Sequence, residues 1–382
     1  MGWERKKAII AELSPAPNIA GWIVSGMLTL VSAVLIFILH ASGSVKPLSE
    51  LNIWYISLGL PLSWCMIFCF RYWFRQRELD NHHFLQQEAE HAQQQWELWA
   101  QRSISVLGSC VLLPDGITAS ALLDAPPGAI PSRGGLTRRI EGIQSPLKSC
   151  LMGVQSTLKV LPPGLSLRVT LLTDGDSVQS GTALSEVWGD VFPNQVAPVD
   201  IVVSELISME HLEERLRLPD LTVDLIIIMQ LHGEAEYSDG LAALLLTSDD
   251  VADKYQLYHS ARLLRPMPLD MPNFEQDITL FLETQTAACG SSRVIEDLLD
   301  WEKITAPLTT AGQKFGALWQ PTQKLNIERV IGKPGQAAPW LLIALAADMV
   351  SLRKESLLTL LSDGTECYIS TLTTGREYEK TG

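Results

Sequence analysis

Two long apolar runs near the start of the chain dominate its hydrophobic pattern. They cover residues 19–39 and 53–70, and a short loop, residues 40–52, separates them. Each run is close to the roughly 20 residues that an α-helix needs to cross the hydrocarbon core of a bilayer. The pattern therefore predicts a transmembrane α-hairpin, followed by a much longer soluble part.

A cleaved signal peptide and a hairpin buried inside a soluble protein are the alternative interpretations of these runs. The first run is too long for the usual apolar core of a signal peptide, and it lacks a small-residue cleavage site followed by a secreted domain. Apolar stretches of this length without a charge are typical of membrane helices. We therefore prefer the membrane hairpin.

Basic residues flank the pair of spans on its outer sides. They are Arg5, Lys6 and Lys7 before the first span, and Arg71, Arg75 and Arg77 after the second. The loop between the spans carries only Lys46. Because Lys and Arg near transmembrane ends stay on the cytoplasmic side, we expect both termini and the soluble part in the cytoplasm.

A polar segment, residues 78–102, follows the second span. It contains no Gly or Pro and is rich in good helix formers, so it predicts a juxtamembrane helix. His82, His83 and His91 on this segment allow a metal site, but a solvated, pH-sensitive helix surface is the preferred interpretation.

The soluble part alternates short β-branched runs with amphipathic stretches, which is typical of an α/β domain around a covered sheet. The expected elements are a strand at 103–113, a helix at 136–160, a strand at 165–173, a helix at 183–191, a strand at 199–203, a helix through 213 and strands at 223–231 and 241–247. Later come a strand at 327–331, a helix through 349 and strands at 356–361 and 366–371. The order strand, helix, hairpin occurs twice, which indicates two related halves rather than a solenoid of short repeats.

Two stretches resemble the thiolase and β-ketoacyl synthase fold. The paired strands that close the first half of that fold resemble DLIIIMQLHGEAEYSDGLAALLLTSDD. The glycine turn, buried helix and closing hairpin of the second half resemble ERVIGKPGQAAPWLLIALAADMV followed by LLTLLSDGTECYISTL. The resemblance covers residues 103–374 and implies layers of helix, sheet, helix, sheet and helix, with two small apolar helices at the centre. The residues that suit a helix packed on all sides are Ala337, Ala338, Ala344, Ala346 and Ala347.

The expected fold class is therefore α/β, with an N-terminal transmembrane α-hairpin and a cytoplasmic, duplicated, thiolase-like αβαβα domain. The expected divisions are residues 1–77 for the N-terminus and hairpin, 78–102 for the juxtamembrane helix, 103–259 and 260–374 for the two halves, and 375–382 for a disordered tail.

The resemblance also implies where reactive groups would stand. Family enzymes use a cysteine at the start of the buried helix in the first half and histidine in the second half. Here the matching stretch, which begins at Ser204, has no cysteine, and Gly332 and Lys333 match the glycine-histidine turn. No histidine follows His259. Because an imidazole is needed to activate a thiolate or to hold an oxyanion, we expect no catalytic residue and no enzyme activity.

Other candidate groups have structural interpretations that we prefer. Ser204 lacks the GxSxG context of an exposed nucleophile, and GAIPSRGG lacks the spacing of a phosphate-binding loop. The acidic loop with His232, Glu234, Glu236 and Asp239 reads as a solvated hairpin loop rather than a metal site. Cys110 and Cys150 read as packing residues. No cofactor or metal site is therefore expected.

Net charge and cysteine content narrow the possible ligands and the cellular compartment. The net charge of -14 argues against nucleic acid, whose phosphates need clustered Lys and Arg. The six scattered cysteines suit a reducing compartment without a disulfide framework.

The preferred hypothesis is a membrane-anchored pseudoenzyme that binds another protein at the bacterial inner membrane. The general pattern is similar to accessory proteins for effectors of type VI secretion, so the expected partners are the lipid bilayer and an effector or secretion component. The alternatives are an acyl-transfer enzyme with a relocated serine or cysteine, and a membrane-acting immunity protein or structural subunit. The resemblance also implies a homodimer, paired through the edge strand at 199–203.

Overall fold

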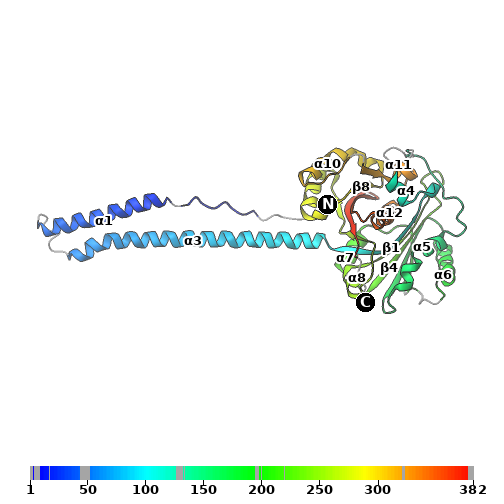
Figure 1. The fold of residues 1–382 in the computed structure, drawn as a ribbon, viewed down its shortest axis with the longest axis horizontal. Helices are drawn as coiled ribbons and strands as arrows, with labels where there is room; N and C mark the ends of the chain where they lie inside the picture. The colour runs from blue at the N-terminus through cyan, green and yellow to red at the C-terminus, as the bar shows by residue number, and fades with distance from the viewer. Residues whose placement is uncertain are drawn as a thin grey trace. The chain divides into compact units, whose positions relative to one another are not determined.

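The computed structural model describes residues 3, 9–16, 18–43, 52–125, 132, 134–193, 198, 200–218, 220–320 and 323–376. The chain forms two compact units, which we call the globular unit (Met1–Glu4 and Trp96–Gly382) and the hairpin unit (Arg5–Gln95) (Figure 1). Several predictions fall outside the described residues: Arg5, Lys6 and Lys7, most of the loop at 40–52, most of GAIPSRGG, and most of the tail.

The hairpin unit contains two apolar helices, α1 (Ile19–Ala41) and α3 (Ile53–Ala100), the second of which extends into the globular unit. By length and composition both can cross a membrane. The predicted second span and the predicted polar helix are one continuous helix of 48 residues, because no helix breaker follows Pro61. The division expected between residues 77 and 78 therefore falls inside α3.

Small and aromatic residues pack the two helices of the hairpin unit together. Gly26 is buried, and a Cβ atom at this position would lie 2.9 Å from Cζ2 of Trp64. The Trp64 Nε1 donates a hydrogen bond to Ser25 Oγ at 3.0 Å. Close approach at a glycine is a common way for apolar helices to associate in a membrane.

One eleven-stranded mixed sheet forms the frame of the globular unit. The first half contributes β1 (Ser103–Leu112), β2 (Ser166–Thr173), β3 (Asp200–Ser204), β4 (Thr222–Gln230) and β5 (Gly240–Ser248). The second half contributes β6 (Ala261–Leu264), β7 (Met267–Leu269), β8 (Arg293–Glu296), β9 (Lys324–Asn326), β10 (Leu357–Asp363) and β11 (Glu366–Thr374).

Strand order confirms the predicted duplication. The first half has the order β3-β2-β4-β5-β1, and the second half has β9-β8-β10-β11 followed by β6 and β7, which both pair with β11. When β6 and β7 are taken as one interrupted strand, both halves share the same order. The closing strand of each half, β5 or β11, runs antiparallel to its neighbours. Antiparallel pairing of β1 with β6 joins the two halves.

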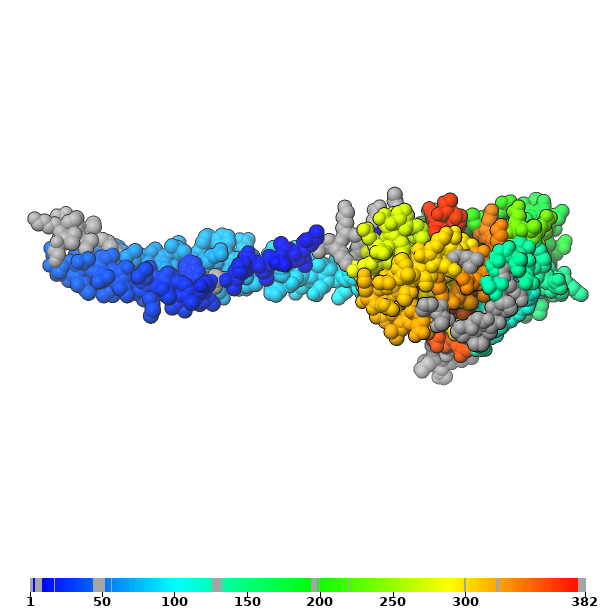
Figure 2. Space-filling view, turned by 90° about the horizontal axis from the view of Figure 1, so that it is seen from above, coloured from blue at the N-terminus to red at the C-terminus, as the bar shows by residue number. Residues whose placement is uncertain are grey.

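Helices cover the sheet in layers. The outer face of the first half carries α5 (Pro146–Val160) and α6 (Ser177–Val191), and the outer face of the second half carries α9 (Phe274–Thr284) and α10 (Thr305–Lys314). Between the halves lies α12 (Ala338–Arg353), as Figure 1 shows. In Figure 2 the two halves cover opposite ends of the globular unit. The remaining helices are short: α4 (Ala119–Asp124), α7 (Glu210–Arg217), α8 (Asp249–Tyr255), α11 (Ile327–Ile331), η1 (Pro114–Gly116), η2 (Met271–Asn273), η3 (Thr286–Gly290) and η4 (Leu299–Ile304).

Only one of the two expected apolar helices occupies the centre. Twelve of the 16 residues of α12 are buried, including Ala344, Ala346 and Ala347, as predicted. Its counterpart in the first half is α7, which has eight residues and buries only Leu212 and Leu216. The expectation of two small apolar central helices was therefore wrong for the first half, because EHLEERLR has charged residues on most of its surface.

Two further element predictions were wrong. Residues 327–331 form the helix α11 rather than a strand, because Asn326 caps it by accepting a hydrogen bond from Arg329 N at 3.2 Å. The helix predicted from residue 136 begins only at Pro146. Gly142 has a φ of 80°, which a helix does not allow, and proline favours the first turn of a helix.

Candidate functional site

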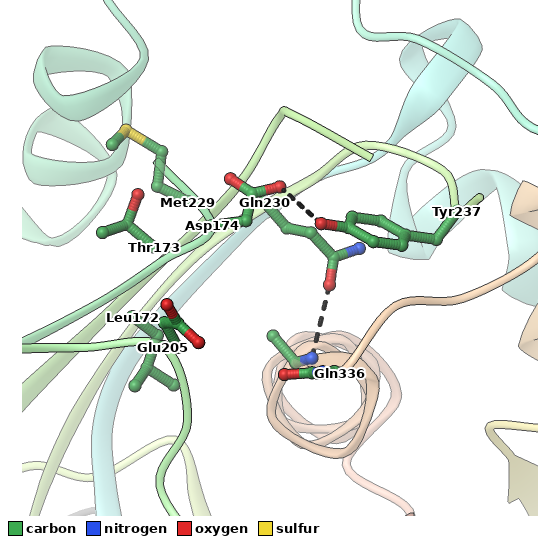
Figure 3. Close-up of a pocket in the computed structure, with 9 residues that line it drawn as sticks. Leu172, Thr173, Asp174, Glu205, Met229, Gln230, Tyr237 and Gln336 are labelled. Carbon is green, nitrogen blue, oxygen red and sulfur yellow. Dashed lines mark hydrogen bonds between the residues drawn. The ribbon is translucent and has the colours of Figure 1, made fainter. Parts of the chain in front are cut away.

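A polar pocket of about 180 Å³, which we call the central pocket, lies where β2 and β4 end and α12 begins (Figure 3). The residues that line it are Leu172, Thr173, Asp174, Glu205, Met229, Gln230, Tyr237, Gln336 and Ala337. Glu205 directly follows Ser204, and Gln336 belongs to the loop that contains Gly332 and Lys333. The central pocket therefore lies where the resemblance expects reactive groups.

Gln230 connects the two halves at the base of the central pocket. Its Nε2 donates to the Ser238 carbonyl oxygen at 2.8 Å. Its Oε1 accepts from the Ala337 backbone N–H at 3.3 Å (Figure 3). A Cβ atom at Gly335 would lie 2.3 Å from the Gln230 Oε1. Both ends of this buried amide are used to fix the start of α12 against β4, so Gln230 has a positioning role.

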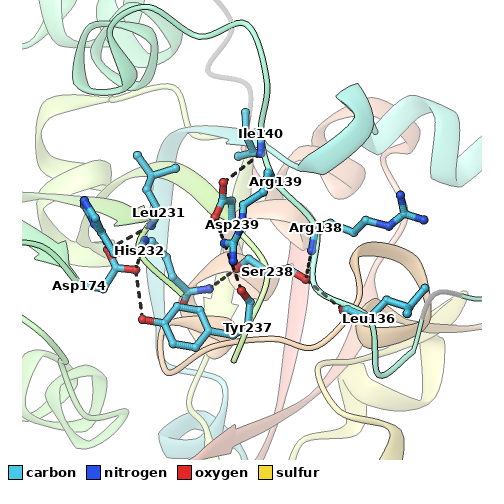
Figure 4. Close-up of polar contacts among 11 residues, drawn as sticks. Leu136, Arg138, Arg139, Ile140, Asp174, Leu231, His232, Tyr237, Ser238 and Asp239 are labelled. Carbon is cyan, nitrogen blue, oxygen red and sulfur yellow. Dashed lines mark hydrogen bonds and ion pairs between the residues drawn. The ribbon is translucent and has the colours of Figure 1, made fainter. Parts of the chain in front are cut away.

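Asp174 is a charged anchor at the rim of the central pocket. It accepts hydrogen bonds from Leu231 N (3.1 Å), His232 N (2.7 Å) and Tyr237 Oη (3.2 Å), and the His232 ring lies 3.0 Å away (Figure 4). Burial raises the pKa of Asp174, but these hydrogen bonds outweigh burial and bring the pKa below its ordinary value. The carboxylate is ionised at neutral pH and orders the loop that follows β4.

The acidic loop between β4 and β5 is tied to both halves (Figure 4). Ser238 N donates to the Lys333 carbonyl oxygen at 2.7 Å, and the buried Asp239 accepts from Ile140 N at 3.0 Å and pairs with Arg139. Glu234 and Glu236 are exposed. No group of three or more His, Cys, Asp or Glu side chains within the described ranges has the arrangement to hold a metal ion.

Ser204, Gly332 and Lys333, the three positions that the resemblance matches to reactive groups, make local structural contacts. Ser204 Oγ donates to the Leu206 carbonyl oxygen at 2.8 Å, which closes a local turn. Gly332 has a φ of 91°, and a Cβ atom there would lie 2.2 Å from the Leu136 carbonyl oxygen, so only glycine fits. Lys333 is exposed, and its backbone N–H donates to the same Leu136 oxygen at 2.8 Å.

No thiol or imidazole lines the central pocket among the residues that define it. Burial raises the pKa of Cys110 to about 11 and that of Cys150 to about 12. Both thiols are protonated at neutral pH, and Cys110 packs so closely that a Cβ atom at Gly153 would lie 2.3 Å from its Sγ. Since the thiolate is the reactive form, neither cysteine has the environment of a nucleophile.

Arg71, Arg75 and Arg77, predicted to set the membrane orientation, all lie on α3. Arg75 pairs with Glu78 at 3.1 Å, and the Arg77 guanidinium lies 5.4 Å from the Trp73 ring centroid. Sequence analysis missed Glu205, Gln230 and Gln336 as pocket residues. The adjacency of Glu205 to Ser204 was an available signal, whereas the position of Gln230 depends on the register of β4.

Solved structures of condensing enzymes match this chain. The AntDE:AntF complex of a type II PKS acyl-carrier protein with its ketosynthase matches with a TM-score of 0.52 at 11% identity, over 72% of this chain and 99% of that chain. The oxazolomycin ketosynthase domain OzmH KS8 of Streptomyces albus JA3453 matches with a TM-score of 0.48 at 12% identity, over 72% and 95% of the chains. OleA of Xanthomonas campestris matches with a TM-score of 0.43 at 10% identity, over 72% and 99%. No family model and no curated protein matches.

The match to the AntDE:AntF ketosynthase, together with the strand order, confirms the predicted thiolase-like fold. At this identity the likeness is one of fold alone.

Proposed function

We propose that this chain is a membrane-anchored, non-catalytic, thiolase-like protein that acts as a binding module at the bacterial inner membrane. The observation that carries this proposal is the chemistry of the central pocket. The central pocket lies beside Ser204 and the loop with Gly332 and Lys333, which the resemblance matches to the reactive cysteine and histidine of condensing enzymes. Its polar lining includes Glu205, Gln230 and Gln336, and Ser204 is held in a local turn. A carboxylate and two amides are poor nucleophiles for acyl transfer.

The surface of the hairpin unit supports the proposed anchor. In α1, large apolar side chains such as Val24, Met27 and Leu28 are each more than 60% exposed. Contiguous apolar surface of this extent is rare on soluble monomers. The basic residues that follow the apolar part of α3, Arg71, Arg75 and Arg77, favour a cytoplasmic position for the rest of the chain.

The position of Trp3, near the N-terminus, also supports a two-span anchor. Its side chain is 9% exposed and belongs to the globular unit, where its ring lies 5.1 Å from that of Trp99 and 5.8 Å from that of Phe281. The N-terminal part of the globular unit ends at residue 4, and the chain re-enters the unit at Trp96. Two membrane crossings between these points return the chain to the side from which it started, which is consistent with a two-span anchor.

The test of the non-catalytic role uses the full chain in an uncharged detergent, treated with an acyl-thioester probe and a fluorophosphonate probe. We expect no covalent adduct in the intact mass. The variant Glu205→Cys is the matched control, because it places a thiol in the central pocket and is expected to carry one iodoacetamide adduct more than the natural chain, whose exposed thiols include Cys65 and Cys69. An adduct on Ser204 or Cys110 of the natural chain would refute the proposal in favour of an acyl-transfer enzyme.

The partner stays a prediction. An effector or component of type VI secretion is the expected partner, and an immunity or structural role in the membrane is the alternative. A pull-down from native membranes with the full chain, compared with a chain in which a flexible linker replaces residues 10–77 so that Trp3 is kept, distinguishes them. A binding module keeps its partner in both forms, whereas a membrane-acting protein loses it with the hairpin.

A further inference from the structure

A second and larger cavity in the globular unit, of about 660 Å³, has no counterpart in the sequence analysis. Four of its lining residues are aromatic: Trp3, Trp96, Trp99 and Tyr368. We call this cavity the tryptophan groove. All of its lining residues belong to the globular unit. Its size is typical of cavities that bind ligands or short peptide segments.

Negative charge accompanies the aromatic rings. Glu210, Glu213 and Glu366 line the tryptophan groove, and its lining residues include no Lys or Arg. Among the described side chains, Glu210 and Glu366 form no ion pair with a basic residue, and Glu366 only accepts a hydrogen bond from the Tyr368 hydroxyl. The lining of the groove therefore combines indole rings with two carboxylates that form no ion pair among the described side chains.

The protein already binds one guanidinium group at the edge of this groove. The Arg265 Cζ lies 4.0 Å from the Trp99 ring centroid, and its Nη1 pairs with Glu213. The Arg265 side chain is 1% exposed, so this combination of indole face and carboxylate holds a cation away from water. Trp96, whose ring lies 5.1 Å from that of Trp99, lines the groove together with Glu210 and Glu366, so an indole ring and carboxylates occur together a second time in its lining.

We propose that the tryptophan groove binds a short, extended, arginine- or lysine-bearing segment of a partner protein. This inference rests on the binding role proposed above and supplies the chemistry of the partner. A guanidinium or ammonium group over an indole face is attracted by the negative face of the ring, and the carboxylates add charge complementarity. Aromatic-lined grooves are a known way to bind extended, proline-containing segments.

Other occupants fit the groove less well. A neutral apolar segment would remove Glu210 and Glu366 from water without giving them a partner, which is unfavourable. A phosphatidylcholine headgroup brings a phosphate together with its ammonium group, and the carboxylates of Glu210 and Glu366 repel that phosphate. An acidic segment is repelled for the same reason.

The test measures fluorescence anisotropy of a labelled peptide, acetyl-Pro-Pro-Arg-Pro-Arg-amide, with the full chain in an uncharged detergent. The comparison peptide has Glu in place of each Arg. We expect the basic peptide to bind at least about tenfold more tightly, and its affinity to fall as salt is raised from low to high concentration. Equal binding of the two peptides would overturn the proposal.

Variants locate the binding. We expect the double variant Glu210→Gln and Glu366→Gln to weaken binding of the basic peptide about tenfold, and Trp96→Ala to weaken it about fivefold, with Trp96→Phe between the latter and the natural chain. Glu214→Gln, an exposed position on α7 outside the groove, is the matched control and should bind as the natural chain does. Unchanged binding by the double variant would overturn the proposal.

Two further measurements distinguish a peptide site from a lipid-headgroup site, and failure of the groove proposal from failure of the proposed non-catalytic role. Glycerophosphocholine should not displace the peptide, whereas N-acetyl-arginine amide should; displacement by glycerophosphocholine at the same concentration would overturn the proposal in favour of a lipid headgroup. An adduct with the acyl probes alongside intact peptide binding would refute only the non-catalytic role. Absence of both adduct and peptide binding would refute only the groove.

Discussion

Replacement of Trp3 by alanine should destabilise the globular unit, although residue 3 is separated from that unit in sequence by the whole hairpin. The indole is 9% exposed and packs in the same apolar cluster as Phe281 and Trp99. Trp3→Ala removes the ring and leaves a space beside Phe281. The perturbation therefore tests whether the N-terminus belongs to the core of the globular unit.

The expected magnitude follows from the area that the ring buries. A buried aromatic side chain removes about 150–250 Å² from water, which corresponds to about 4–6 kcal/mol at about 25 cal/mol per Å². Ordering of the backbone and the ring of a terminal residue costs about 2 kcal/mol of conformational entropy. The free energy of unfolding should therefore fall by about 2–4 kcal/mol, which agrees with the usual cost of large-to-small aromatic substitutions.

Thermal unfolding of the full chain in detergent, followed by near-ultraviolet circular dichroism, measures this loss. At about 2 °C per kcal/mol for a large domain, the Tm should fall by about 4–8 °C. Ile9→Ala is the control, since Ile9 is 97% exposed and the change should leave the Tm unaltered. A Tm of Trp3→Ala within about 1 °C of that of the natural chain would refute the packing of Trp3 and its support for the two-span topology.

Three further predictions concern a buried acid, the acidic loop and the sheet edge. Burial raises the pKa of Asp348 to about 6, above its unfolded value of 3.8, so the folded state loses stability as pH rises from about 4 to about 6. Asp348→Asn should therefore increase the free energy of unfolding at pH about 7.5 by at most about 3 kcal/mol, with a higher Tm. At pH about 4 the variant and the natural chain should have the same Tm in thermal unfolding. Asp239→Ala should lower the free energy of unfolding, measured in denaturant, by about 2–3 kcal/mol, because Ile140 N and Arg139 lose their buried acceptor. A change below about 0.5 kcal/mol would contradict the stabilising role of Asp239 in the acidic loop. β3 is an edge strand on which Ile201 is 37% and Val202 is 42% exposed. Ile201→Lys should therefore convert the predicted homodimer to a monomer, as measured by sedimentation. A natural chain that sediments as a monomer would refute dimerisation.

The parts of the fold that sequence analysis predicted correctly are those with long, nearly continuous apolar runs. β4 and β5 are continuous apolar runs, and α12 has small residues that suit a helix buried on all sides. The predictions were wrong where residue composition favoured one element and a single capping or glycine residue decided for another. IERVI has the β-branched composition of a strand, yet Asn326 caps it as a helix, and the stretch before Pro146 has helical composition but a glycine that requires positive φ.

The candidate sites were less predictable because they depend on contacts between distant segments. The resemblance points to Ser204 and Gly332, which lie near the central pocket. The hydrogen bond of Gln230 with Ala337 could not be predicted, because it depends on the register of β4 and on the angle at which α12 begins. The tryptophan groove combines Trp3, Trp96 and Tyr368, which lie far apart in the chain. Their sequence contexts are an N-terminal segment, a polar helix and a hairpin, and none of these contexts predicts a shared cavity.

Membrane topology is the most direct test of the proposed anchor and of the position of the globular unit. Native membranes that contain the full chain are washed with alkaline carbonate and then treated with trypsin as right-side-out or inside-out vesicles. We predict that the chain stays with the membrane and that the globular unit is digested only in inside-out vesicles. Release by carbonate, or digestion of the globular unit in right-side-out vesicles, would contradict a two-span anchor with both termini in the cytoplasm.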